Sequence, residues 1–158
     1  MNKKIVILLA MILILGLAAS TSSVVSADEA VVPFKATYAT TISSSPGDPG
    51  CNNLVIHGTG KAAHLGKSRM DSLSIACFAA LTQTGSLEFT SANGDKLFGS
   101  FSGTLAFSGP IVTFWGSYEM TDDGTGRFDG NTGTGTYSGK ASLVTNKGTI
   151  TFKGELHK

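Results

Sequence analysis

A histidine and an arginine in glycine-rich segments are the residues best placed to do chemistry in this chain. His64 lies in the segment Gly58–Gly66, and an imidazole can act as an acid or a base near neutral pH. Arg127 lies in the segment Thr121–Gly133, where its guanidinium could hold a carboxylate or a phosphate of a ligand. For both residues we favour a structural role. His64 would hydrogen-bond a neighbouring strand or loop. Arg127 would tie its loop to the barrel through Asp122, Asp123 or Asp129.

Metal and nucleophile chemistry find little support in the residue pattern. Asp122, Asp123 and Asp129 are close in sequence, but they lack the spacing and the final glutamate of a calcium loop. The three histidines are scattered. No Gly-x-Ser-x-Gly elbow and no Walker A loop occurs. We therefore expect no catalytic residue, no metal and no cofactor.

Aromatic residues form the second group of candidates. They recur at alternate positions in the segments that read as strands, and no carboxylate shares their face. The members of this set are Phe101, Phe107, Phe114, Tyr118, Tyr137 and Phe152. Such residues can fill a core or line a pocket for a flat or apolar ligand, and the sequence leaves both open. The candidate ligand-binding residues are Phe101, Phe114, Tyr118, Tyr137, Arg127 and His64.

Period-two alternation predicts the elements that would position these side chains. Leu97, Phe101 and Leu105 alternate with Ser100, Ser102 and Thr104, and Asn93-Gly94 before them is typical of a tight hairpin turn. We expect about eight strands, near 34–42, 53–64, 69–77, 84–92, 96–107, 111–120, 134–145 and 148–156. The segment 43–52, rich in Ser, Pro and Gly, should be a loop.

The glycines indicate how these strands are arranged. Several lie on the apolar face between large residues, such as Gly99, Gly103, Gly135 and Gly139. This pattern suits strands that coil tightly around a narrow interior. The fold class is therefore all-β, and a single closed antiparallel barrel is favoured over the alternative, a two-sheet β-sandwich.

The N-terminus has the features of an export signal. Lys3 and Lys4 precede an uncharged apolar stretch, and Val25-Ser26-Ala27 fits a signal peptidase. We expect a signal peptide at 1–27 and a β-barrel domain at 28–158, secreted or periplasmic. The mature chain would carry ten basic and eleven acidic residues in scattered positions. Nucleic acid is therefore an improbable partner. No later stretch is long and apolar enough to cross a bilayer, so we expect no membrane insertion of the mature chain.

Cys51 and Cys77 are the two cysteines of the chain. In an exported protein an even number of cysteines predicts a disulfide. Two unrelated buried thiols are the alternative. A metal site is disfavoured because neither cysteine has a neighbouring cysteine or histidine at a ligand spacing.

Three segments carry a resemblance to a known family. They are Gly58–Lys67 (GTGKAAHLGK), Thr90–Asp95 (TSANGD) and Gly124–Gly133 (GTGRFDGNTG). In this order they resemble a bacterial exported family with an allene oxide cyclase barrel-like domain, and plant dirigent proteins share that barrel. The resemblance implies an eight-stranded, lipocalin-like antiparallel barrel. The plant cyclases use an acidic residue and an asparagine near the first strands, and Phe34–Ile42 contains neither.

Two classes of function follow. The first is a non-catalytic module that binds a small apolar ligand or serves as a structural protein of the cell envelope. The alternative is a barrel isomerase or cyclase related to allene oxide cyclase. Catalysis needs a titratable group in the cavity, and the predicted inward faces hold mainly Leu, Phe, Gly, Ala and Tyr. This composition favours binding.

Overall fold

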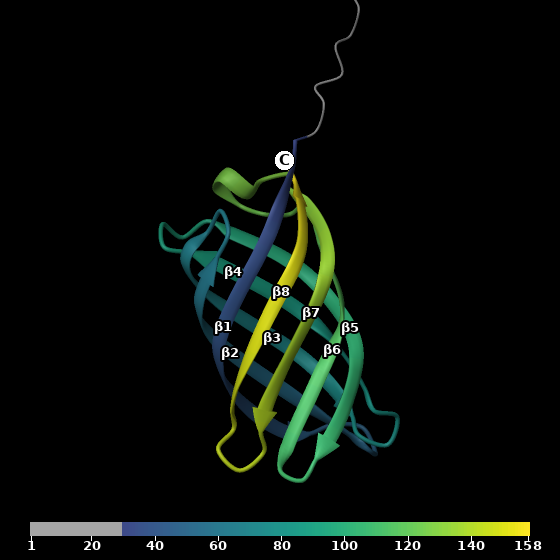
Figure 1. The fold of residues 1–158 in the computed structure, drawn as a ribbon. Coiled ribbons are helices and arrows are strands. Elements are labelled where there is room, and N and C mark those ends of the chain that lie inside the picture. Colours follow the sequence, from purple (N-terminus) through teal and green to yellow (C-terminus); the bar gives the residue numbers. More distant parts are fainter. Residues whose placement is uncertain (1–29) are drawn as a thin grey trace, which may run out of the picture.

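Eight antiparallel strands close into one barrel in the computed structural model, which describes residues 30–158 (Figure 1). The predicted signal peptide lies outside the described residues. The strands are β1 (Val31–Pro46), β2 (Cys51–Ala62), β3 (Gly66–Cys77), β4 (Thr82–Ser91), β5 (Lys96–Ser108), β6 (Ile111–Met120), β7 (Thr132–Ser142) and β8 (Lys147–His157). Each strand pairs with the next, and β8 pairs with β1 to close the barrel. The predicted closed barrel is confirmed, and the sandwich alternative is wrong.

Glycines make room for large rings on the inner wall, as the sequence pattern predicts. Gly103 on β5 pairs with Gly116 on β6, and a side chain at Gly103 would collide with the hydroxyl of Tyr137. In the same way, a side chain at Gly139 would collide with the ring of Phe114. Since each ring lies over a glycine, the aromatic residues fit inside a barrel of only eight strands.

The first hairpin is longer than the sequence predicts. The structure continues β1 to Pro46 and begins β2 at Cys51, so the connecting loop comprises only residues 47–50. Ser44 pairs with Leu54, and Pro46 pairs with Asn52. The expectation that 43–52 forms a loop was wrong because strand pairing overrides the weak β-propensity of serine and proline near the end of a strand.

The two ends of the barrel differ in how they are filled. The closed end carries the C-terminus and the segment 121–131, which contains the short 3-10 helix η2 (Gly126–Phe128) (Figure 1). Phe128 from this segment is 1% exposed and joins the main core cluster with Phe34, Phe89 and Leu97. The open end carries the loops 47–50, 78–81, 109–110 and 143–146. Its core cluster is much smaller, with Ala76, Leu105, Val112 and Ala141.

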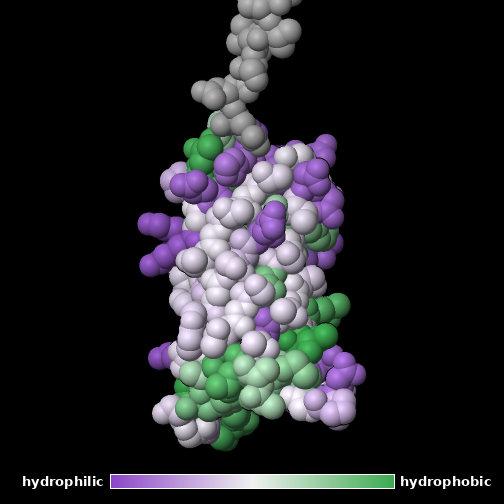
Figure 2. Space-filling model, turned by 90° about the vertical axis from the view of Figure 1, so that its right-hand side faces the viewer, coloured by the Kyte–Doolittle hydropathy of each residue, from purple (hydrophilic) through white to green (hydrophobic). Residues whose placement is uncertain are grey.

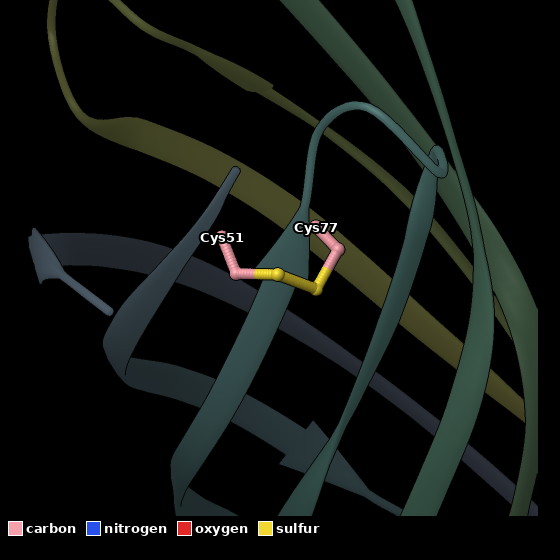
Figure 3. Close-up of a disulfide and its surroundings, with 2 residues drawn as sticks. All are labelled: Cys51 and Cys77. Carbon is pink, nitrogen blue, oxygen red and sulfur yellow. A yellow bond between two sulfur atoms is a disulfide. The ribbon is translucent and has the colours of Figure 1, made fainter. Parts of the chain in front are cut away.

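A disulfide joins two strands at the open end. Cys51 begins β2, Cys77 ends β3, and the two residues are directly paired in the ladder (Figure 3). The predicted pairing is confirmed. The bond fixes the end of the β2–β3 pair beside the loops 47–50 and 78–81.

Candidate ligand cavity

The open end of the barrel contains a cavity of about 270 Å³. The floor of the cavity is formed by side chains that also belong to the main core cluster, such as Met70, Leu87, Ile150 and Phe152. This cluster fills the half of the barrel next to the closed end, which we call the packed half. Because these residues are buried against the closed end, the cavity ends midway along the barrel. It is a cup with one mouth.

Apolar side chains from several strands form the wall of this cup. Phe101 and Leu105 come from β5, Val112 and Phe114 from β6, and Ala141 from β7. They point inward because each strand alternates between its two faces. The wall is therefore suited to an apolar molecule.

The cavity also contains a few polar groups. The side-chain amide of Gln83 donates a hydrogen bond of 2.8 Å to the hydroxyl of Tyr137, and both residues are buried. Burial raises the pKa of Tyr137 to about 12, although the hydrogen bond from Gln83 acts in the opposite direction. The hydroxyls of Thr40 and Ser72 are buried in the wall and have no hydrogen-bond partner in the described part of the chain.

Charged groups are absent from the lining. Among residues 30–158, no Lys, Arg, His, Asp or Glu contributes to the cavity. Tyr137 is the only titratable residue of the lining within that range, and it is neutral at physiological pH.

Exposed apolar side chains surround the mouth. Phe78 and Leu143 line the cavity and are 38% and 52% exposed, and the neighbouring Val144 is 77% exposed. Leu81 and Ile111 lie at the same end of the barrel and are also exposed. Figure 2 shows apolar surface gathered at this end, while the opposite end and the side of the barrel are mostly polar or neutral. The cavity therefore opens through an apolar rim.

The structure brings three of the predicted ligand-binding residues to the cavity. Phe101, Phe114 and Tyr137 line it, and the rings of Phe101 and Tyr137 meet edge to face at 5.2 Å between centroids. Tyr118 points inward but lies in the packed half, 5.5 Å from Phe152 between ring centroids. Burial raises the pKa of Tyr118 to about 12.

His64 and Arg127 lie at the closed end, far from the mouth of the cavity. The Nε2–H of His64 donates to the carbonyl of Pro33 at 3.1 Å, from a turn in which His64 has a φ of 66°. Arg127 lies 3.4 Å from the carboxylate of Asp95 and packs over the ring of Phe128 at 4.9 Å. Both side chains thus hold loops to the barrel. The partner of Arg127 is Asp95 rather than an aspartate of its own segment.

Backbone contacts attach the segment 121–131 to the barrel. The backbone N–H of Thr125 donates to the carbonyl of Lys96, and the N–H of Lys96 donates to the hydroxyl of Thr125, each at 2.9 Å. Gly126 has a φ of 62°, and a side chain there would collide with the carboxylate of Asp95. The glycines of this segment therefore permit a tight turn over the closed end.

Sequence reasoning did not select three polar residues of the cavity lining, Thr40, Ser72 and Gln83. Their signal was a polar residue at an inward position of an alternating strand, as Thr40 is between Tyr38 and Ile42. In a strand rich in serine and threonine this signal is visible only after the inward face has been assigned.

A charged side-chain cluster on β2 and β3 faces outward. Asp71 accepts hydrogen bonds from the Nδ1–H of His57 at 2.6 Å and from the Nε–H of Arg69 at 2.7 Å. Partial burial works against ionisation of Asp71, but these two hydrogen bonds outweigh it and lower the pKa of the carboxyl. Within residues 30–158, no three His, Cys, Asp or Glu side chains are grouped as metal ligands.

Comparisons of the chain with protein-family models, with curated proteins and with solved structures found no match. No helix in the described part of the chain is long and apolar enough to span a membrane.

Proposed function

We propose that this protein is an exported β-barrel that binds a small apolar molecule in the cavity of its open end, without chemical turnover. The observation that carries the proposal is the cavity itself. An uncharged space of about 270 Å³ is walled by aromatic and aliphatic side chains and opens through an apolar rim. The cavity belongs to one half of the barrel, while the other half is filled. Export is supported by the disulfide, because such bonds persist in oxidising compartments.

The size of the cavity limits the ligand. At roughly 30 Å³ for each water-sized unit, the volume holds a molecule of about ten non-hydrogen atoms. Small ligands gain between about 0.3 and 1.5 kcal/mol for each such atom, so a middle value of about 0.6 gives roughly −6 kcal/mol. This corresponds to a Kd on the order of 40 μM.

The lining favours binding over catalysis. A barrel isomerase or cyclase would need an acid or a base whose pKa suits proton transfer near neutral pH. The titratable group available in the described lining is Tyr137, and its pKa of about 12 makes it a weak acid that stays protonated. No observation on the cavity supports turnover.

Isothermal titration calorimetry with compounds of eight to twelve non-hydrogen atoms, drawn from terpenoids and short fatty acids, tests the proposal. Wild type should bind at least one with a Kd of about 10–100 μM. Ala141→Phe places a ring in the cavity, and Lys140→Phe adds the same ring to an exposed position of the same strand. Binding should be lost in the first variant and kept in the second. Equal binding by both folded variants, or no binding by wild type, would contradict the proposal.

A further inference from the structure

We infer that the cavity selects an uncharged molecule with one hydrogen-bonding group, such as an alcohol, an aldehyde or a ketone, and rejects carboxylates and amines. This inference rests on the proposed function and specifies the chemistry of the ligand. It is carried by three unsatisfied or half-satisfied hydroxyl groups in a mostly apolar wall.

Two hydroxyl groups are buried in the wall without a protein partner. Thr40 is 5% exposed and Ser72 is 4% exposed, and within residues 30–158 neither side-chain oxygen makes a hydrogen bond. Most buried polar groups are paired, and an unpaired one costs free energy. Both oxygens are covered by neighbouring atoms in this structure. A polar group of the ligand would reach them when the side chain rotates about χ1, and the new hydrogen bond would remove this cost.

Both hydroxyls lie near the floor of the cavity. Thr40 is two residues from Tyr38 on the inward face of β1, and Ser72 is two residues from Met70 on the inward face of β3. Tyr38 and Met70 belong to the packed half of the barrel. A ligand would therefore place its polar group inward and leave its apolar part toward the aromatic wall and the mouth.

The hydroxyl of Tyr137 offers a third polar contact. It accepts the hydrogen bond from Gln83, and within the described residues it has no acceptor for its own proton. A hydroxyl whose oxygen already accepts one bond is well suited to donate to a carbonyl or hydroxyl oxygen. The polar side chains that line the cavity are therefore hydroxyls and amides, which can donate or accept hydrogen bonds, rather than ions.

A charged ligand would lack a counter-ion in this cavity. Burying a carboxylate or an ammonium group without an opposite charge is strongly unfavourable. In the part of the chain that the structure describes, no charged side chain lines the cavity. Tyr137, its only titratable residue there, has a pKa of about 12 and supplies no charge between pH 5 and 8. The cavity therefore discriminates against ions by the cost of removing their water.

A matched set of four compounds tests the inference by calorimetry. The compounds are 3-phenylpropan-1-ol, propylbenzene, 3-phenylpropanoate and 3-phenylpropylamine. At pH 7 the alcohol should bind at least about tenfold more tightly than the carboxylate or the amine. The carboxylate should gain up to about tenfold in apparent affinity for each unit by which the pH falls from 7 to 5, because its protonated form alone enters; a free carboxyl has a pKa of about 4–5.

Two conservative variants test the role of the hydroxyls. Thr40→Val and Ser72→Ala should each weaken binding of the alcohol by about threefold to tenfold and leave binding of propylbenzene unchanged or tighter. The control is Ser74→Ala, because Ser74 is also a buried hydroxyl without a partner in the described chain but does not line the cavity. The melting temperature of every variant should equal or exceed that of wild type, so loss of the fold would not be confused with loss of a contact.

The outcomes separate this inference from the proposed function. Binding of the carboxylate as tight as that of the alcohol at pH 7, if it is abolished by Ala141→Phe, would overturn the inference and keep the cavity as a ligand site. An unchanged alcohol-to-propylbenzene ratio in Thr40→Val and Ser72→Ala would also overturn it. Binding of none of the four compounds by wild type would overturn the proposed function together with the inference.

Discussion

Removing a phenylalanine ring should have very different consequences in the two halves of the barrel. Phe128 is 1% exposed and packs within the filled half, whereas Phe101 is half-buried and lines the cavity. A ring removed from a packed site leaves a void, and its loss costs both the transfer free energy and the cavity term. A ring removed beside an existing cavity only enlarges that cavity. We therefore expect Phe128→Ala to be much more destabilising than Phe101→Ala.

The magnitudes follow from burial. Phe128→Ala should reduce the free energy of unfolding by about 3–5 kcal/mol, the range for a buried ring. Phe101→Ala should cost about 1–2 kcal/mol, mainly through its edge-to-face contact with Tyr137 at 5.2 Å. For a domain of about 130 residues, the unfolding entropy is roughly 0.27 kcal/mol/K. The melting temperature should then fall by about 15 °C for Phe128→Ala and by about 4–7 °C for Phe101→Ala.

Thermal melts followed by far-UV circular dichroism, together with calorimetry of 3-phenylpropan-1-ol, check both variants. Phe128→Ala should keep its affinity for the alcohol at temperatures where it is folded, because Phe128 lies at the closed end. Phe101→Ala should bind the alcohol more weakly and accept larger molecules. Equal melting temperatures for the two variants, or a larger loss for Phe101→Ala, would refute the division of the barrel into a filled half and a hollow half.

Three further predictions concern the disulfide, the closed end and pH. Replacing both Cys51 and Cys77 by serine should lower the free energy of unfolding by about 3.5 kcal/mol, because the disulfide closes a loop with a sequence separation of 26. The melting temperature should then fall by roughly 13 °C. A melting temperature of wild type that does not change when reductant is added would contradict this prediction. Gly126→Ala should lower the free energy of unfolding, measured by chemical denaturation, by about 1 kcal/mol or more, because Gly126 has a φ of +62° and the new methyl group would collide with Asp95. A stability equal to that of wild type would refute this prediction. Burial raises the pKa of Tyr38, Tyr118 and Tyr137 to about 12, so above pH 10 the folded state binds more protons than the unfolded state. The contribution of these tyrosines to the free energy of unfolding should therefore be constant below pH 9 and fall between pH 10 and 12 in denaturation curves, and a stability that does not fall over that window would contradict the burial of these hydroxyls.

Much of the fold could be predicted from the sequence because it depends on local alternation. In β5, Leu97, Phe101 and Leu105 alternate with polar residues such as Ser100 and Ser102, and the structure places all three on the inward face. Glycines opposite large rings, as Gly103 is to Tyr137, indicated a narrow closed barrel rather than a sandwich. These signals lie within single strands or their neighbours.

The candidate site was only partly predictable, since it depends on how far the barrel is filled. Phe114 and Tyr118 belong to one inward face of β6, and yet one lines the cavity and the other is packed in the core. The alternation that selects them is the same. Tyr118 belongs to the core cluster that also contains Phe128 from the segment 121–131, whereas Phe114 is only partly buried against that cluster. A contact made by a loop across the end of a barrel has no local signal in the sequence.

A crystal structure of the protein soaked with 3-phenylpropan-1-ol tests the central claim most directly. The account predicts density for one molecule inside the open half, with its ring beside Phe101 and Phe114 and its hydroxyl toward Thr40, Ser72 or Tyr137. The closed end should be unchanged around Phe128. A structure in which the rings of the open half have collapsed together and leave no space for the alcohol would contradict the account.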